Sequence, residues 1–384
     1  MRKLFCDGMI YDSASRSFVR ADILVEDTQI VKIEEEVDIL LADEIVDCEG
    51  KFIIPGFVDV HSHGRTKIDF NNVKSADDVR DLRESYAKVG TTTFMATLAS
   101  APYDSLITSI DAINKNREVE SGKATVAGIH LEGRYLNEKR RGAHASELLH
   151  ELDGEELGGL IDKMLPAPVH VSAALELAND SFYTAALSRG ATLGIAHSDA
   201  TYDEAMDALN RGAVSFTHTF NAMRPMHHRE PGNISASLLS NGYTELICDG
   251  EHVHPAMISM AQRLKPEGKL VLITDSMEAA GAEEGEYSIA GLKVFVRDGK
   301  AVNAEGALAG STLDMMTALK NYMSFCSLTL EEALPAATSN PAAMVGISDS
   351  CGSIAEGLRA DFIILDSKED VTVDSVYAAG GKVK

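Results

Sequence analysis

Two histidines stand one residue apart, at positions 61 and 63, where the apolar segment FVDVHSHG (57–64) ends. Alternate residues of a β-strand point to the same side, so the imidazoles of His61 and His63 would share one face of a predicted strand. One interpretation of this spacing is a pair of metal ligands. The other is two unrelated histidines at a strand end, and the HxH pattern alone does not decide between them.

Four further residues of metal-ligand type each lie near the end of a different β-type segment: Glu132, His197, His218 and Asp275. Imidazole and carboxylate ligands together suit zinc or iron. The set contains no cysteine, which favours an open catalytic site over a closed structural one. The sequence therefore predicts a site for a divalent transition metal, with zinc preferred and iron as the alternative.

Eight β-type segments alternate with helical patterns and would position these residues. The segments are FVDVHSHG (57–64), TTTFMAT (91–97), TVAGIHLEG (125–133), VHVSAAL (169–175), ATLGIAH (191–197), AVSFTHTF (213–220), TELICDGEH (244–252) and KLVLITDSM (269–277). Most are apolar throughout, as strands covered on both faces are. Eight βα units in a row predict an α/β fold, a (β/α)₈ TIM barrel, with its active site at the C-terminal strand ends.

The two ends of the chain predict a second unit. Residues 1–54 and 350–384 both contain short strands separated by turns, and neither segment is long enough for a stable β-domain alone. We expect them to pair into one small β-sandwich domain beside a barrel domain at 55–349. A β-hairpin near 286–303, turning at Asp298 and Gly299, is expected as an insertion after the eighth strand.

Composition limits the partners and the compartment. The net charge of −24 disfavours nucleic acid and anionic membranes as partners. No apolar run is long enough to span a bilayer, and the N-terminus lacks the apolar segment of a signal peptide, so a cytoplasmic location is expected. The five cysteines form no CxxC pair, which predicts buried reduced thiols instead of disulfides or a zinc ribbon.

Four longer motifs resemble a known family. They are GIHLEGRYLNEKRRGAHA (128–145), THTFNAMRPMHHREPG (217–232), CDGEHVHP (248–255) and LITDSMEAAG (272–281). With the HxH pair they are similar to the N-acetylglucosamine-6-phosphate deacetylase family of the amidohydrolase superfamily, over nearly the whole chain. The resemblance implies hydrolysis of N-acetylglucosamine 6-phosphate to glucosamine 6-phosphate and acetate, in amino-sugar metabolism.

The resemblance also implies how the metal ligands are divided. Glu132 would take a bridging place between two metal sites. His197 and His218 would complete the first site with Glu132, and His61 and His63 would hold a second metal. Some members of the family lack the HxH pair and use one metal, whereas this chain has both histidines.

Asp275 would be both a metal ligand and the general base, according to the same resemblance. It would take a proton from metal-activated water and then deliver that proton to the departing amine. A metal lowers the pKa of bound water and polarises the acetamide carbonyl. A carboxylate within reach can then move one proton in each half of the reaction.

Substrate contacts are implied for a second set of residues: His144, Asn221, Ala222, Arg229 and His252. The backbone of Asn221 and Ala222 would hold the phosphate, and His144 and His252 would contact the sugar. Arg229 would reach the phosphate from the neighbouring subunit, which implies a homodimer. A guanidinium suits a phosphate monoester because it can bind bidentately.

Two stretches depart from the family pattern. Arg134 stands where the family usually has proline, and Arg65 and Lys67 follow the first strand where the family is usually glycine-rich. These basic side chains would lie on loops at the catalytic face, where they could narrow the pocket or contact an anion. Gly310 and Ser311 could offer backbone amides to the substrate. Helix capping by Ser311 is the alternative.

Three alternatives stay open at this point. The substrate could be N-acetylgalactosamine 6-phosphate or another acylated amino-sugar phosphate. The activity could be that of a cyclic-amide hydrolase or deaminase of the superfamily, although the NAM and REPG elements argue against it because they serve a sugar phosphate. The chain could also be a scaffold that has lost its metals, which the complete set of ligand-type residues disfavours.

Overall fold

Eight parallel strands form the centre of the molecule in the computed structural model, which describes residues 1–289, 291–304 and 306–383. In order around the sheet they are β8(Phe57–Ser62), β11(Thr91–Leu98), β12(Thr125–Glu132), β13(Val169–Ala173), β14(Thr192–Ile195), β15(Ala213–Phe216), β16(Tyr243–Ile247) and β17(Leu270–Ile273). The Asp275 N–H donates to His61 O at 2.8 Å, which joins the last strand to the first. The predicted (β/α)₈ barrel is confirmed.

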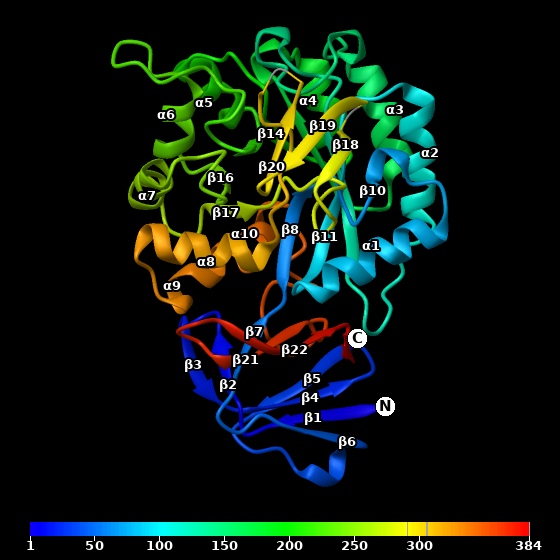
Figure 1. Ribbon diagram of the computed structural model, residues 1–384, viewed down its shortest axis with the longest axis vertical. Helices are drawn as coiled ribbons and strands as arrows, with labels where there is room; N and C mark the ends of the chain where they lie inside the picture. The colour runs from blue at the N-terminus through cyan, green and yellow to red at the C-terminus, as the bar shows by residue number, and fades with distance from the viewer. Residues whose placement is uncertain (290, 305, 384) are drawn as a thin grey trace.

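Helices surround the barrel (Figure 1). They are α1(Ala76–Lys88), α2(Tyr103–Asn114), α3(Gly154–Met164), α4(Asp180–Leu187), α5(Tyr202–Asn210), α6(Gly232–Leu239), α7(Pro255–Leu264), α8(Met315–Cys326), α9(Leu330–Ala337) and α10(Ser339–Met344). The first of them illustrates how the sequence sets these elements. Ser75 and Asp78 form a capping box at the start of α1, and Val79, Leu82 and Tyr86 form its buried face.

Two further sheets lie beside the barrel, one built from the N-terminal segment alone and the other from both ends of the chain. One contains β5(Gln29–Glu34), β4(Asp22–Glu26), β1(Arg2–Cys6) and β6(Glu44–Asp47), and the other contains β23(Gly381–Lys382), β22(Thr372–Ala378), β21(Phe362–Ser367), β7(Phe52–Pro55), β2(Met9–Asp12) and β3(Ser17–Arg20). Phe5 packs edge-on against Phe362 and Tyr377 between the sheets. Figure 1 shows this sandwich, blue and red, below the barrel. The sandwich is confirmed, while the division at 54/55 and 349/350 stays a prediction.

The insertion after β17 differs from the expected hairpin. It contains three antiparallel strands, β18(Gly285–Ile289), β19(Leu292–Arg297) and β20(Lys300–Asn303). The turn at Asp298 and Gly299 joins the last two strands as predicted. The additional strand forms because Tyr287 and Ile289 belong to the same apolar cluster as Val294, Val296 and Met277.

All five cysteines are free thiols. Cys48, Cys248 and Cys351 are buried, as expected, whereas Cys6 and Cys326 are partly exposed. Within the described residues, none of the helices has the length and apolarity needed to cross a bilayer. The expected cytoplasmic location stays a prediction.

Candidate metal centre and active site

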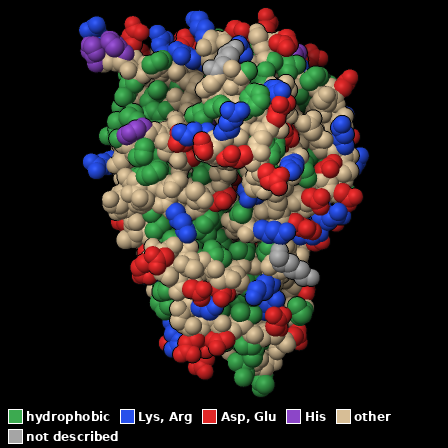
Figure 2. Space-filling view, in the orientation of Figure 1, with side chains coloured by type: hydrophobic (Ala, Val, Ile, Leu, Met, Phe, Trp, Pro, Cys, Tyr) green, Lys and Arg blue, Asp and Glu red, His purple; other side chains and the backbone are tan. Residues whose placement is uncertain are grey.

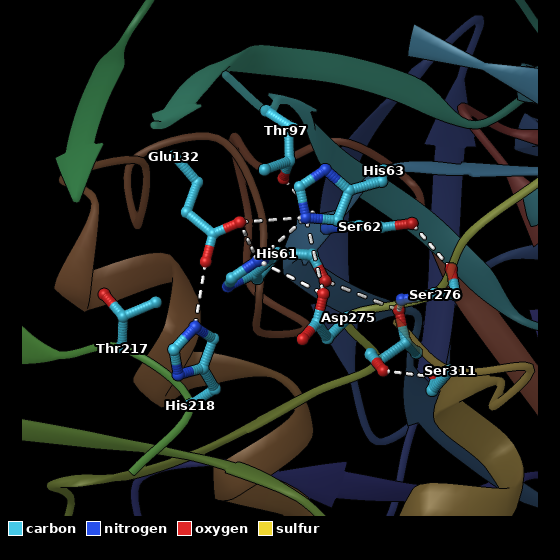
Figure 3. Close-up of polar contacts among 12 residues, drawn as sticks. His61, Ser62, His63, Thr97, Glu132, Thr217, His218, Asp275, Ser276 and Ser311 are labelled. Atoms are coloured by element: carbon cyan, nitrogen blue, oxygen red, sulfur yellow. Dashed lines mark hydrogen bonds and ion pairs between the residues drawn. The ribbon is translucent and has the colours of Figure 1, made fainter. Parts of the chain in front are cut away.

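The six ligand-type side chains meet at the C-terminal mouth of the barrel, where all of them are buried. The carboxylate of Glu132, the last residue of β12, lies between two pairs of histidines. Its Oε1 is 2.9 Å from His218 Nε2 and 3.3 Å from His197 Nε2. Its Oε2 is 3.0 Å from His63 Nε2 and 3.4 Å from His61 Nε2. Figure 3 shows Glu132 directed toward His61, His63 and His218.

The spacing of the ligand atoms fits metal binding. The two Nε2 atoms of His61 and His63 are 3.4 Å apart, and those of His197 and His218 are 3.1 Å apart. Asp275 Oδ1 lies 3.5 Å and 3.4 Å from the Nε2 atoms of His61 and His63, respectively. Nitrogen and oxygen ligands at about 2.0–2.1 Å from a tetrahedral zinc ion lie roughly 3.3 Å apart. The residues present therefore fit a metal ion.

The ligand-type residues form two groups. One group, termed the first metal site, is the candidate ligand set Glu132, His197 and His218. The other, termed the second metal site, is the candidate ligand set His61, His63 and Asp275, which Glu132 also faces. His144, whose Nε2 is 3.9 Å from Glu132 Oε2, lies beside the first metal site and is a candidate ligand there.

The electrostatics of the site favour positive charge at the imidazoles. Burial alone would lower the pKa of His63, but Asp275 and Glu132 outweigh this effect and raise the pKa to about 9. Burial would raise the pKa of Glu132, and the surrounding histidines instead hold it well below its usual value. Positive charge is thus favoured among these side chains. A metal ion would compete with protons for the ligand atoms of the histidines.

The backbone also takes an unusual form where the chain leaves three barrel strands. His197, His218 and Asp275 have φ values of 43°, 30° and 48°, in the left-handed region that side-chain-bearing residues seldom adopt. Each of them stands two residues beyond its strand, so β14, β15 and β17 end earlier than the sequence predicted. Strained conformations of this kind gather at functional sites, where the surrounding structure holds them in place.

Ser311 holds the loop that carries Asp275. Its N–H donates to Asp275 O at 2.8 Å, and its Oγ donates to Thr274 O at 2.6 Å. The alternative of helix capping by Ser311 is wrong, because the side chain of Asp314 caps α8. Figure 3 shows Ser311 next to the Asp275 loop.

A cavity of about 170 Å³ opens above the ligands. The predicted substrate contacts His144, Asn221, Ala222 and His252 line it, together with Gly310. Burial and nearby His197 lower the pKa of His144 to about 3, so its imidazole is neutral. The arrangement offers a buried site with carboxylates and imidazoles at its floor and further polar groups on its walls, as hydrolysis of a small polar molecule requires.

Comparison with known proteins agrees with this geometry. Residues 52–383 match the model of the Amidohydrolase family. The chain belongs to the amidohydrolase family. It is 32% identical over 365 residues to the N-acetylglucosamine-6-phosphate deacetylase of Lysinibacillus sphaericus, covering 92% of this chain and 91% of that protein.

Two further similarities concern function and structure. The chain is 33% identical over 330 residues to the N-acetylgalactosamine-6-phosphate deacetylase of Escherichia coli O157:H7, covering 84% of this chain and 86% of that one. The crystal structure of N-acetylglucosamine-6-phosphate deacetylase from Pasteurella multocida superimposes with a TM-score of 0.91 at 27% identity, covering 100% of this chain and 99% of that one.

Arg229 of this amidohydrolase lies apart from its own cavity. It is exposed in the loop before α6, where its Nη1 donates to His228 Nε2 at 2.8 Å. Figure 1 shows this loop extending from the barrel at the upper left, and Figure 2 shows histidine and basic side chains gathered there. Arg229 is therefore not brought together with the other predicted substrate contacts within one subunit.

The three basic residues that depart from the family pattern do not line the cavity either. Lys67 is exposed, 3.9 Å from Glu283, and Arg65 is buried next to Gly281. Arg134 is only 2% exposed and has a φ of 64°. Its guanidinium contacts protein groups away from the cavity.

Arg134 connects the loop after β12 to α3. Its Nε donates to Glu156 Oε1 at 3.0 Å, its Nη1 donates to Ala101 O at 2.7 Å, and its Nη2 lies 3.0 Å from His150 Nε2. We expect Arg134→Ala to lower the free energy of unfolding by about 3 kcal/mol, because it removes a buried guanidinium together with its hydrogen bonds to protein groups. KM should stay within about twofold of the unchanged protein, because the contacts of Arg134 lie away from the cavity and do not bind substrate.

Denaturant unfolding and steady-state kinetics would check this expectation, with Lys67→Ala as the exposed control that should change stability by less than about 0.5 kcal/mol. A large increase in KM for Arg134→Ala without loss of stability would contradict this structural role and indicate that Arg134 contacts the substrate.

Several residues of the site were not found from the sequence. Ile289 and Leu308 line the cavity from the insertion, whose packing against the barrel mouth no local pattern reveals. Ser100 supports His144, since its Oγ lies 2.9 Å from His144 Nδ1. Glu245 is fully buried on β16, and an isolated acidic residue within an apolar strand was a signal that could have found it.

Proposed function

We propose that this protein is a metal-dependent hydrolase that removes the acetyl group from N-acetylglucosamine 6-phosphate. The products are glucosamine 6-phosphate and acetate. The observation that carries the proposal is the meeting of Glu132, Asp275 and two histidine pairs below a small cavity, within a chain related over its length to deacetylases of acetylated amino-sugar phosphates. Such a site suits an amide bond, which requires both an activated nucleophile and a protonated leaving group.

The metal would be held by the first metal site, the second metal site or both, with zinc preferred and iron as the alternative. When bound, it supplies an electrophile that polarises the acetamide carbonyl and lowers the pKa of water. The choice of zinc or iron rests on the imidazole and carboxylate ligands, which suit both.

Asp275 is assigned to proton transfer. Burial would raise the pKa of its carboxyl group, but His61 and His63 lower it, so Asp275 is ionised and ready to accept a proton. Its carboxylate lines the cavity and can take a proton from the attacking water. It then returns that proton to the amine nitrogen, which is a poor leaving group until it is protonated.

The cavity walls are assigned to the sugar phosphate. His144 is held through Nδ1 by Ser100, and His252 is held through Nδ1 by Asp249 Oδ2 at 2.6 Å. Their Nε2 atoms remain available for sugar hydroxyls or the acetamide. The backbone of Asn221 and Ala222 is assigned to the phosphate, as the motif resemblance implies.

Arg229 is assigned to the phosphate of the neighbouring subunit in a homodimer, since its exposed loop extends away from its own barrel. We expect Arg229→Ala to raise KM for the phosphorylated substrate by roughly 10- to 100-fold, because a hydrogen bond to a charged group contributes about 1.5–3 kcal/mol. KM for unphosphorylated N-acetylglucosamine should not change.

Steady-state kinetics on both sugars would check this expectation, with Lys139→Ala as a control for an exposed cation on another loop. Mixing the Arg229→Ala and Asp275→Asn proteins should restore part of the activity, because a mixed dimer contains one complete site. Equal effects of Arg229→Ala on both sugars, or a fully active monomer, would contradict the assignment.

The substrate is tested by measuring acetate release from N-acetylglucosamine 6-phosphate, N-acetylgalactosamine 6-phosphate and both unphosphorylated sugars. We expect the highest kcat/KM for N-acetylglucosamine 6-phosphate. A preference for the galactosamine isomer would replace the substrate but keep the chemistry. Activity on a cyclic amide alone would overturn the proposal.

A further inference from the structure

Glu245 is a buried carboxylate that the proposed reaction does not use. It is the third residue of β16, its side chain faces His61 and His170, and its exposed fraction is 0%. Its Oε2 lies 3.4 Å from His61 Nδ1 and accepts the backbone N–H of His218 at 3.3 Å. One carboxylate oxygen thus contacts a residue of each metal site.

The other oxygen of Glu245 has no hydrogen-bond partner within the described part of the chain. His170 Nε2 lies 3.9 Å from this Oε1. A buried carboxylate with an unsatisfied oxygen is unfavourable unless nearby positive charge compensates for it. A metal ion at the neighbouring histidines would supply such charge.

The contact with His61 has a specific chemical consequence. When Nδ1–H donates to Glu245, the proton is fixed on Nδ1 and the lone pair of Nε2 is free. That Nε2 faces Glu132 Oε2 at 3.4 Å and Asp275 Oδ1 at 3.5 Å, on the side of the second metal site. A carboxylate behind a histidine ligand in this way orients the ring and increases its basicity.

The other ligand histidines are supported differently. His197 Nδ1 donates to Arg140 O at 2.8 Å, whereas the Nδ1 atoms of His63 and His218 have no hydrogen-bond partner in the described residues. Asp59, on the same strand as His61, accepts the backbone N–H of His61 at 3.3 Å instead of a ring N–H. Glu245 therefore offers a contact to the His61 ring that this nearby acid does not.

We propose that Glu245 is a positioning residue that orients His61 and thereby strengthens metal binding at the second metal site. This inference rests on the proposed metal-dependent function. It concerns the second site alone, so its test measures metal binding instead of deacetylation.

The experiment titrates Zn²⁺ into the metal-depleted full-length protein in competition with a chromophoric chelator. We expect the unchanged protein to bind two ions. Glu245→Gln should bind one ion with unchanged affinity and the other roughly 10- to 100-fold more weakly. The first metal site then serves as an internal control, because a misfolded protein would lose both ions.

Asp59→Asn is the matched control, since it changes a buried acid near His61 without touching the ring, and it should bind both ions normally. Glu245→Asp keeps the charge but shortens the side chain, and it should also weaken one ion alone. In a His61→Asn background, Glu245→Gln should cause no further loss, because the ring through which it acts is absent.

Several results would overturn the proposal. They are unchanged affinities in Glu245→Gln, equal weakening in Asp59→Asn, equal loss of both ions, a further loss in the His61→Asn background, and a single ion bound by the unchanged protein. None of them would by itself refute the deacetylase proposal, since one metal ion in the first metal site would still support hydrolysis.

Discussion

Replacing Asp275 by asparagine is expected to lower kcat by about 10²- to 10⁴-fold while metal stays bound. Asparagine keeps the shape of the side chain and one oxygen beside His61 and His63, but it cannot accept a proton. Both halves of the reaction depend on that proton, since the same group would activate water and protonate the leaving amine. Steady-state kinetics with N-acetylglucosamine 6-phosphate and metal analysis of the same sample would check both parts of this expectation.

Asp69→Asn provides a matched control for Asp275→Asn. Asp69 is also a buried aspartate close to the barrel mouth, where it accepts the backbone N–H of Asn71 at 2.7 Å, but it does not line the cavity. Its replacement should change kcat by no more than a few-fold. Near-normal turnover in Asp275→Asn, with metal bound, would remove Asp275 from proton transfer.

Replacing Glu132 by glutamine is expected to weaken metal binding at both sites and to abolish measurable turnover. Its two carboxylate oxygens face one histidine pair each, at distances of 2.9–3.4 Å. Glutamine replaces one oxygen with an amide N–H₂ and removes the negative charge from both pairs. We expect affinity to fall by more than about 100-fold, the upper range for residues that only support a ligand.

Metal content after gel filtration, measured together with kcat, would check the effect of Glu132→Gln. Glu156→Gln is a suitable control, because Glu156 pairs with Arg134 outside the cavity and should retain metal. Full metal content and full activity in Glu132→Gln would contradict the bridging role.

The fold and the ligand set could largely be predicted because they depend on patterns along the chain. Parallel barrel strands bring their C-terminal ends to one rim, so residues such as Glu132 and His197 can be placed together from their positions on separate strands. The strand ends were less accurate. The sequence places His197 inside a strand, whereas that strand ends at Ile195. The difference arises because the left-handed φ of 43° at His197 depends on the surrounding site, which no local pattern shows.

Side-chain direction on loops could not be predicted in this way. Arg134 follows a strand at the catalytic face, yet its guanidinium turns toward Glu156 on α3, a helix that begins 20 residues later in the chain. Arg229 lies within a family motif, but the motif does not reveal that its side chain is exposed on a loop away from the cavity. Ile289 reaches the cavity because an inserted sheet packs over the barrel, which depends on tertiary contacts and not on local periodicity.

The most direct test of metal-dependent deacetylation is acetate release from N-acetylglucosamine 6-phosphate by the unchanged protein before and after metal removal. The protein would be stripped with a chelator, assayed, and assayed again after zinc or iron is restored, with bound metal measured each time. We expect release to disappear with the metal and to return with it. Undiminished release from metal-free protein, or no release at any metal content, would contradict this function.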